Sequence, residues 1–269
     1  MNIFSKLHAS FLHDYYFLRT KKLSFSGKIQ FLLQKYVRFV IKKQTIFYFG
    51  NILSYDNPHT PTLLELYPNE VEVMAQYIPM KNVKKVMDIG ANIGQWASTV
   101  LAYFPKATVF SFEPNSHIYP LLAQNSTYHR SWKTFNFGIG KSKPKNFLYF
   151  TKDHSATGTT IPNKNKDITK IKATILPLNK NTLTKYRLPS HVDLLKIDVE
   201  GAEVEALEAL KSLTYTYLYI EVSLGRTEGA RIEDIMSILK KQGKRPVLKY
   251  LHSVGKNAPA GNAIIELTH

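Results

Sequence analysis

The 269-residue chain contains no cysteine. Without thiols it cannot form a disulfide, a thiolate zinc site, a cysteine-ligated iron–sulfur cluster or a cysteine nucleophile. Radical chemistry on such a cluster and methylation of cytosine at C5 are therefore excluded. The compartment stays open, because a thiol-free protein suits reducing and oxidising surroundings alike.

Long hydrophobic runs are also missing. No stretch approaches the ~20 nearly uninterrupted apolar residues that a membrane-spanning helix needs, and the first residues lack the pattern of a signal peptide. Apolar residues still make up 44% of the chain, enough for one large α/β domain with an appendage. We expect a cytoplasmic protein that lies at most on the inner face of a membrane.

Acidic residues are scarce, with 20 Asp and Glu against 36 Lys and Arg. Residues 1–50 alone hold nine basic residues and one acid, Asp14, and further basic excess lies in residues 141–172 and 240–256. The rest of the chain is mildly acidic. A basic surface suits the phosphates of nucleic acid or an anionic membrane, yet here it lies outside the central part of the chain.

Residues 1–50 form a basic appendage that we expect to be helical. From Ile29 onward, apolar residues recur with the spacing of one helix face, at Leu32, Leu33, Tyr36, Val37, Val40 and Ile41. Basic residues fall on other faces, at Lys28, Lys35, Arg38 and Lys42. The commoner fate of such a helix is to pack on the neighbouring domain, and the alternative is to lie on an anionic membrane.

Residues 86–94 read as an apolar strand that meets an acid, Asp88, and then two glycines. Gly90 and Gly94 allow a tight turn and a close approach of the backbone to a ligand before a helix that begins at Gln95. A dinucleotide site needs three glycines in G-x-G-x-x-G spacing to seat a pyrophosphate. The loop therefore predicts a nucleotide-like cofactor without phosphates.

A second strand that ends in an acid lies at residues 108–113, and Glu113 follows Asp88 by 25 residues. Ribose hydroxyls are commonly held at this position, because a carboxylate accepts both hydrogen bonds of a vicinal diol. A solvated strand-end glutamate is the simpler alternative. Two acid-ended strands at this spacing favour ribose binding.

A third motif makes a resemblance to a known family specific. Residues 195–203, Leu-Lys-Ile-Asp-Val-Glu-Gly-Ala-Glu, resemble the FkbM family of S-adenosylmethionine-dependent methyltransferases, and residues 88–94, 112–114 and 219–221 match the same family. The resemblance covers about residues 50–267. It implies a class I methyltransferase fold and, typically, methylation of a hydroxyl on a sugar or related natural product.

Strands and helices alternate after the appendage, which predicts one α/β domain over residues 51–269. We expect a Rossmann-like, mostly parallel sheet with helices on both faces and an antiparallel last strand. Strands are expected at 45–54 (a pair), 84–89, 108–112, 133–137, 146–150, 173–177, 192–197, 216–222, 246–250 and 262–267. Helices are expected at 69–77, 94–104, 116–126, 202–211 and 231–242.

Ligands bind at the carboxyl ends of the strands in such sheets, where Asp88, Glu113, Asn136, Asp198 and Glu221 should meet. As the resemblance implies, the backbone of the glycine loop would wrap the methionine part of the cofactor, with Asp88 orienting the loop and Glu113 holding the ribose. Asn136 would stand near the adenine, although a turn before Gly138 explains it equally well. The loop residues concerned are Gly90, Ala91, Asn92 and Gly94.

Asp198 and Lys196 are the candidates for the chemistry. Strand alternation places both on one side of their strand, where a buried ion pair is the simpler explanation. The alternative is that Asp198 takes the proton of the acceptor hydroxyl or holds a divalent cation, with Lys196 as the second candidate. The residues do not decide whether a metal takes part.

Other polar residues are weaker candidates. Segment 151–160 is polar and is predicted to form a lid over the acceptor. His154 within it and His191 before the Asp198 strand are less favoured bases, because isolated loop histidines are usually surface residues. Glu200 and Glu203 are explained by the dipole of the following helix.

The expected acceptor is a glycan or glycolipid. An RNA methyltransferase is an alternative that the basic charge favours, but methylation of base amino groups usually goes with an Asp/Asn-Pro-Pro-aromatic signature. This chain has Asp198-Val-Glu-Gly at that place. A membrane-associated module with a non-catalytic pocket is the third possibility, and nothing in the residues indicates the oligomeric state.

Overall fold

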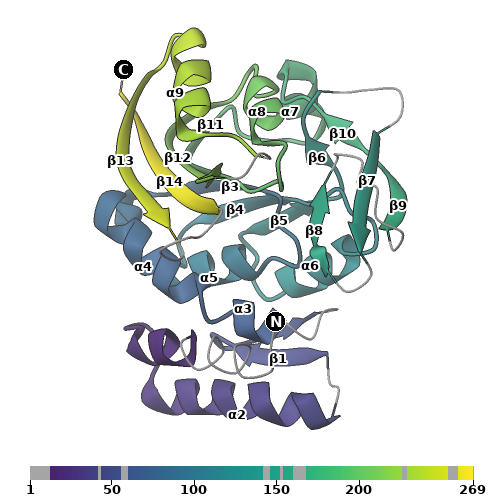
Figure 1. The fold of residues 1–269 in the computed structure, drawn as a ribbon, viewed down its shortest axis with the longest axis vertical. Coiled ribbons are helices and arrows are strands. Elements are labelled where there is room, and N and C mark those ends of the chain that lie inside the picture. The colour runs from purple at the N-terminus through teal and green to yellow at the C-terminus, as the bar shows by residue number, and fades with distance from the viewer. Residues whose placement is uncertain are drawn as a thin grey trace.

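The structure is a computed structural model that describes residues 13–41, 44–55, 60–141, 146–151, 154–159, 168–225, 229–253 and 260–268. Its centre is a seven-stranded sheet in the order β13-β14-β12-β11-β3-β4-β5 (Figure 1). Neighbours are parallel except at β14, which runs antiparallel to β12 and β13. The strands are β3 (Lys85–Ile89), β4 (Thr108–Phe112), β5 (Trp132–Phe135), β11 (His191–Ile197), β12 (Thr214–Ser223), β13 (Arg245–Ser253) and β14 (Ala260–Thr268).

Helices cover both faces of this sheet, as predicted (Figure 1). One face carries α4 (Tyr67–Tyr77), α5 (Gln95–Tyr103) and α6 (Tyr119–Ser126). The other carries α7 (Lys180–Lys185), α8 (Glu203–Glu208) and α9 (Ile232–Lys241). The predicted mostly parallel α/β sheet with an antiparallel end strand is confirmed.

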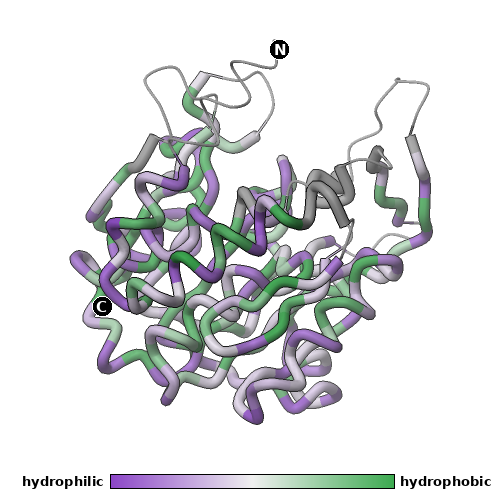
Figure 2. The backbone as a smooth tube through the Cα atoms, turned by 90° about the horizontal axis from the view of Figure 1, so that it is seen from below, coloured by the Kyte–Doolittle hydropathy of each residue, from purple (hydrophilic) through white to green (hydrophobic). Residues whose placement is uncertain are grey.

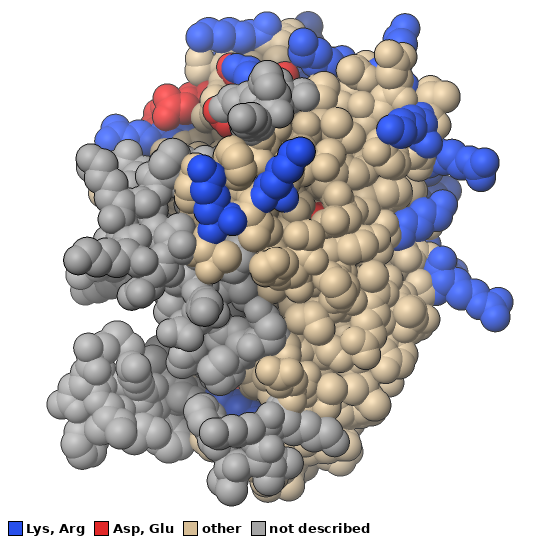
Figure 3. All heavy atoms as spheres, turned by 90° about the vertical axis from the view of Figure 1, so that its right-hand side faces the viewer, with Lys and Arg blue, Asp and Glu red and all other residues tan. Residues whose placement is uncertain are grey.

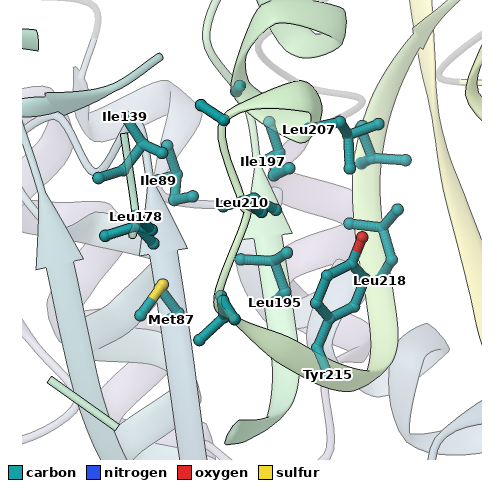
Figure 4. Packing of buried hydrophobic residues seen from close by; sticks show 14 of the residues in the cluster. Met87, Ile89, Ile139, Leu178, Leu195, Ile197, Leu207, Leu210, Tyr215 and Leu218 are labelled. Carbon is teal, nitrogen blue, oxygen red and sulfur yellow. The ribbon is translucent and has the colours of Figure 1, made fainter. Parts of the chain in front are cut away.

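Successive residues of a strand enter two different cores. Met87 and Leu195 pack with α8 in one cluster, shown in Figure 4, whereas Val86 and Leu194 pack with α4 and α5 in the other. The central strands are apolar on both faces because side chains alternate and helices cover each face. The same alternation puts Asp88 and Lys196, which are direct register partners, on the α5 side.

Two smaller sheets lie beside the main one. Ile175–Leu176 (β10) pairs with Gly138–Ile139 (β6), and Asn146–Thr151 (β7) lies between His154–Thr159 (β8) and Ile168–Ala173 (β9). Within the range 173–177, where one strand was expected, the structure has only the last residue of β9 and the two residues of β10. The segment expected to form a lid, residues 151–160, contains β8, which pairs with β7. Residues 152–153 and 160 of that segment lie outside the described residues.

The N-terminal layer lies against the α5 and α6 side of the domain (Figure 1). It contains a helical stretch at 13–19, α2 (Phe25–Ile41) and the hairpin of β1 (Thr45–Tyr48) and β2 (Asn51–Ser54). The short helix α3 (Thr60–Leu63) follows the hairpin and leads to α4, and the short η1 (Met80–Asn82) connects α4 to β3. The domain boundary at residue 50 stays a prediction, and the turn of the hairpin lies at that position.

The orientation of α2 differs from the expected one. Phe31 and Lys35 are buried, whereas Leu33, Tyr36 and Val37 of the predicted core-facing stripe are exposed. Lys35 lies within 2.6 Å of Asp14 Oδ1 and 2.8 Å of Glu65 Oε1. Two carboxylates from other segments make burial of this lysine tolerable, and apolar spacing within the helix cannot reveal them. The side chains of residues 38–41 and residue 42 lie outside the described part.

Lys28 is also buried, and its Nζ donates hydrogen bonds to the carbonyl oxygens of Leu18 and Thr20. Among the described residues, no helix has the length and apolar character needed to cross a membrane.

Candidate functional site

The glycine loop follows β3 and is held by its neighbours in the sheet. The N–H groups of Gly90 and Ala91 both donate to the Phe112 carbonyl oxygen, at 3.1 and 3.0 Å. Gly90 and Gly94 have φ of +84° and +88°, and a β-carbon on Gly94 would lie 2.4 Å from the Trp132 ring. Only glycine fits both the conformation and the space at these two positions.

Glu113 directly follows the end of β4, and its carboxylate faces the glycine loop. Oε2 accepts a hydrogen bond from the Asn92 N–H at 2.8 Å, and Oε1 accepts one from the Asn115 N–H at the same distance. Burial raises the pKa of Glu113 to about 7. The role expected for Asp88 in orienting the loop thus belongs to Glu113 and the Phe112 carbonyl oxygen.

Asp88 serves a different purpose. It is fully buried, and its Oδ1 lies 3.3 Å from Lys196 Nζ. Ser111 Oγ donates to Asp88 Oδ2 at 3.4 Å. Burial raises the pKa of Asp88, and the adjacent ammonium opposes that shift. Asp88 therefore compensates the charge of a buried lysine, which its place in a central strand requires.

Lys196 joins two acids. Its Nζ lies 3.1 Å from Asp198 Oδ2 as well as close to Asp88, which agrees with the alternation expected along β11. Burial lowers the pKa of Lys196, but the two carboxylates outweigh burial and the net shift is upward. A lysine that stays protonated cannot take a proton from an acceptor. Lys196 therefore positions Asp198, whose side chain is 37% exposed.

A hollow that is partly open to solvent lies at the carboxyl ends of β3, β4 and β11. Gly90, Asn92, Glu113 and Asp198 line it, so the structure brings together four of the predicted site residues. Of the loop residues proposed for the cofactor, Ala91 is buried behind this surface in the apolar core.

Asn136, which was expected near the adenine, does not line the hollow, whereas Asn115, for which the sequence predicted no role, does. Asn136 is exposed and donates its amide to the Glu113 carbonyl oxygen at 2.9 Å, and it is not among the residues that line the hollow. The buried Nδ2 of Asn115 has no hydrogen-bond partner among the residues that the structure describes. A buried donor at a pocket wall is suited to a ligand acceptor. Its position two residues after Glu113 was the only signal in the sequence.

Sequence reasoning also missed a group of polar residues from α4, α5 and β12 beside Asp198. Tyr219 donates its hydroxyl to Glu70 Oε2 at 3.2 Å, and Gln95 Nε2 donates to the Tyr67 hydroxyl at 3.3 Å. Burial, together with the negative charge of Asp198, raises the pKa of Glu70 to about 7. No spacing in the sequence links Glu70 on α4 to Tyr219 or Asp198, so the sequence held no signal that these side chains lie close together.

Three carboxylates gather near the same strand end. Oxygen atoms of Asp198, Glu200 and Glu221 lie within 4.8 Å of one another. The buried Glu203 instead accepts a hydrogen bond from the Gly201 N–H at 2.9 Å at the start of α8, which agrees with a structural role.

His191 lies at the opposite end of β11 from Asp198, where its ring contacts Thr214 Oγ1 at 3.0 Å. Seven residues of strand separate it from the site, or about 23 Å, so it cannot serve as a base there. The side chain of His154 lies outside the described part.

The residues present fit S-adenosylmethionine. The loop has no third glycine for a pyrophosphate, Glu113 offers a carboxylate to a diol, and the unpaired Asn115 amide offers a donor. Gly90 leaves no room for a side chain, because a β-carbon there would lie 1.8 Å from the Asp198 carbonyl oxygen. The loop backbone and the end of β11 together form the wall of the pocket.

Comparison with known proteins gives a consistent result. The Methyltransferase FkbM domain family matches residues 88–246. Methyltransferase 1 of Beauveria bassiana (strain ARSEF 2860) is 23% identical over an aligned length of 177 residues, and the match covers 58% of this chain and 71% of that protein.

A solved structure shares the fold at low identity. A protein assigned as a transferase from Pyrococcus horikoshii superposes with a TM-score of 0.50 and 12% identity, over 88% of this chain and 82% of that one. An S-adenosylmethionine-dependent methyltransferase from Aquifex aeolicus gives a TM-score of 0.44 and 17% identity, over 79% and 95%. The family match spans more than half of the chain and contains the loop, Glu113 and Asp198, so this protein belongs to the FkbM family of S-adenosylmethionine-dependent methyltransferases.

Proposed function

We propose that the enzyme methylates a hydroxyl oxygen of a glycan, a glycolipid or a related natural product in the cytoplasm. The position of Asp198 carries this proposal. Its partly exposed carboxylate lines the cofactor pocket and forms an ion pair with the buried Lys196. A hydroxyl becomes a good nucleophile only when its proton leaves, so a positioned carboxylate supports transfer to oxygen.

The residues around the pocket divide the work. S-adenosylmethionine, when bound, supplies an electrophilic methyl group on a sulfonium. The loop backbone, Glu113 and Asn115 hold the donor, and such positioning can lower a barrier by ~7–11 kcal/mol. Asp198 accepts the proton of the acceptor hydroxyl on a carboxylate oxygen, and Lys196 keeps that carboxylate oriented.

An alternative role for Asp198 is to bind a divalent cation together with Glu200 and Glu221. A divalent cation held by these three carboxylates would acidify the hydroxyl directly, with the same acceptor chemistry. Treatment of the purified enzyme with EDTA, followed by repletion with Mg²⁺ or Mn²⁺, separates the two roles. Full activity after chelation assigns proton acceptance to Asp198 alone.

The test of the proposal is transfer of labelled methyl groups into fractions from cells that lack the gene. We expect label in the carbohydrate or lipid fraction with the wild-type enzyme and none with Asp198→Asn. Label confined to ribosomal or transfer RNA would replace the proposal with a nucleic-acid methyltransferase. On the face seen in Figure 3, Lys and Arg project at scattered places, whereas RNA phosphates are best bound by one continuous basic surface.

A further inference from the structure

We infer that the N-terminal layer docks the enzyme on an anionic lipid surface through one exposed face of α2. This face, the apolar stripe, is a row of five side chains between 37% and 75% exposed. Its members are Phe25, Ile29, Leu33, Tyr36 and Val37. The inference goes beyond the methyl transfer and does not depend on which acceptor is used.

Helix geometry separates the apolar stripe from the face that holds α2 on the protein. At 100° per residue, Phe25, Leu33 and Val37 fall within one sector of the helix, and the buried Phe31 and Lys35 fall roughly opposite. Figure 2 views the molecule from the side of α2 and shows hydrophobic residues recurring along it. Helix α2 thus packs on the protein through the face of Phe31, Lys28 and Lys35, and the apolar stripe is left exposed.

Exposed apolar surface concentrates in this layer. Of the fourteen large hydrophobic residues that are exposed in the described part, ten lie between Tyr15 and Ile52. Besides the apolar stripe they are Tyr15, Tyr16, Leu18, Phe47 and Ile52. Soluble proteins rarely expose such a concentration without a partner, and aromatic side chains are favoured where water meets lipid.

The charge of the layer selects an anionic partner. Arg19, Lys21 and Lys22 are exposed. The single acid of residues 13–55, Asp14, is buried, where it accepts hydrogen bonds from Lys35 and Tyr36. No acidic side chain is therefore exposed in the described part of this layer. A basic, apolar and aromatic surface has the chemistry of an interfacial helix on anionic phospholipid.

The layer is firmly joined to the cofactor loop. Ile93 of the loop packs in the same buried cluster as Phe31 and Tyr48. Asn125 bridges the hairpin and the loop, with its Nδ2 donating to the carbonyl oxygens of Ser54 at 3.0 Å and Ile93 at 2.9 Å. Docking through α2 would therefore hold the cofactor pocket at a constant orientation to the lipid surface.

The test uses the full-length protein and sedimentation with phosphatidylcholine vesicles, with and without phosphatidylglycerol. We expect binding only to vesicles that contain phosphatidylglycerol, weakening as salt rises. Leu33→Asp/Val37→Asp should lower that binding at least about tenfold, because two apolar side chains lose their burial in lipid. The matched control is Leu248→Asp/Val247→Asp, which changes exposed residues of the same types on β13 and should bind as the wild type does.

A second pair of variants tests charge alone. Lys21→Glu/Lys22→Glu should lose several-fold in binding, whereas Lys240→Glu/Lys241→Glu on α9 should not. Calorimetric binding of S-adenosylhomocysteine shows that each variant is folded. This charge pair keeps the inference testable if the stripe variant fails to fold.

Several results would overturn the inference. One is no binding to anionic vesicles, and another is equal loss in the β13 control. A wild-type dimer in light scattering that Leu33→Asp/Val37→Asp converts to a monomer would make the apolar stripe a subunit interface. A large drop in melting temperature of that variant without any vesicle binding would assign the stripe to residues 1–12 of the same chain.

Discussion

The carbonyl oxygen of Asp198 occupies the space that a side chain on Gly90 would need. A β-carbon on Gly90 would lie 1.8 Å from this oxygen. The Asp198 N–H also donates to the Ile89 carbonyl oxygen at 3.1 Å. The cofactor loop and the end of the strand that carries the candidate base are therefore in direct backbone contact, and a shift of one moves the other.

Gly90→Ala should damage both stability and cofactor binding. Gly50→Ala is the matched control, because Gly50 has the same φ of +84° and no atom within 4 Å of an added β-carbon. The control measures the backbone conformation alone, about 1–2 kcal/mol, and Gly90→Ala adds the steric overlap, about 1–3 kcal/mol more. Urea unfolding and calorimetry with S-adenosylhomocysteine measure the two effects. Equal losses in both variants would show that the overlap is relieved.

The affinity for S-adenosylmethionine should fall as the pH drops below about 7, where Glu113 becomes protonated. A protonated carboxyl no longer accepts both hydrogen bonds of a diol. Glu113→Gln should bind weakly and without this pH dependence, and Glu113→Ala should abolish binding. The loss at low pH is not an unfolding effect of this group. Its pKa is raised on folding, so lowering the pH from about 7 towards 4.5 favours the folded state.

Asp198→Asn should leave cofactor affinity within about threefold and lower turnover by ~10²–10⁴ if the carboxylate accepts the acceptor proton. Glu233→Gln on the exposed start of α9 is the control and should change neither quantity. Calorimetry and methyl transfer into the acceptor fraction give the two readouts. An Asp198→Asn enzyme with normal turnover would make Asp198 a structural partner of Lys196 only.

Lys35→Met should lower the free energy of unfolding by about 3–5 kcal/mol, because Asp14 and Glu65 would remain buried without their cation. Burial raises the pKa of Glu65 to about 9 and Lys35 opposes that shift, so without the ammonium Glu65 would be protonated and Asp14 would be the buried charge without a cation. Lys22→Met, at an exposed position beside the same helix, should stay within about 0.5 kcal/mol of the wild type. Urea titration monitored by circular dichroism compares them, and similar midpoints would rule out a stabilising role for the ion pair.

The central strands and the helices that follow them were largely predictable. Thr108–Phe112 matches its expected bounds, and β3, β11 and β14 begin or end within two residues of theirs. These segments are apolar on both faces, so the local pattern is strong. Strand β8 was missed, because its pairing with β7 is a contact with another segment that its own polar residues do not announce.

The site was predictable to the extent that residue type decides geometry. Gly90, Asn92, Glu113 and Asp198 line one pocket, as strand-end positions in a parallel sheet indicate. Three features could not be inferred from the sequence. They are the pairing of Asp88 with the buried Lys196, the unpaired amide of Asn115 and the contact of Glu70 with Tyr219. Each depends on which polar atoms reach the same buried place.

The sequence by itself determined the family, the glycine loop and the alternation of Lys196 and Asp198, because a positive φ and a two-residue repeat follow from local chemistry. Only the tertiary structure decided that Lys35 is buried and the apolar stripe of α2 is exposed. A buried charge is tolerated only where opposite charges surround it, and the carboxylates of Asp14 and Glu65 reach Lys35 from separate segments. Hydrophobic periodicity within one helix cannot report such partners, so the direction in which that helix faces is a property of the assembled fold.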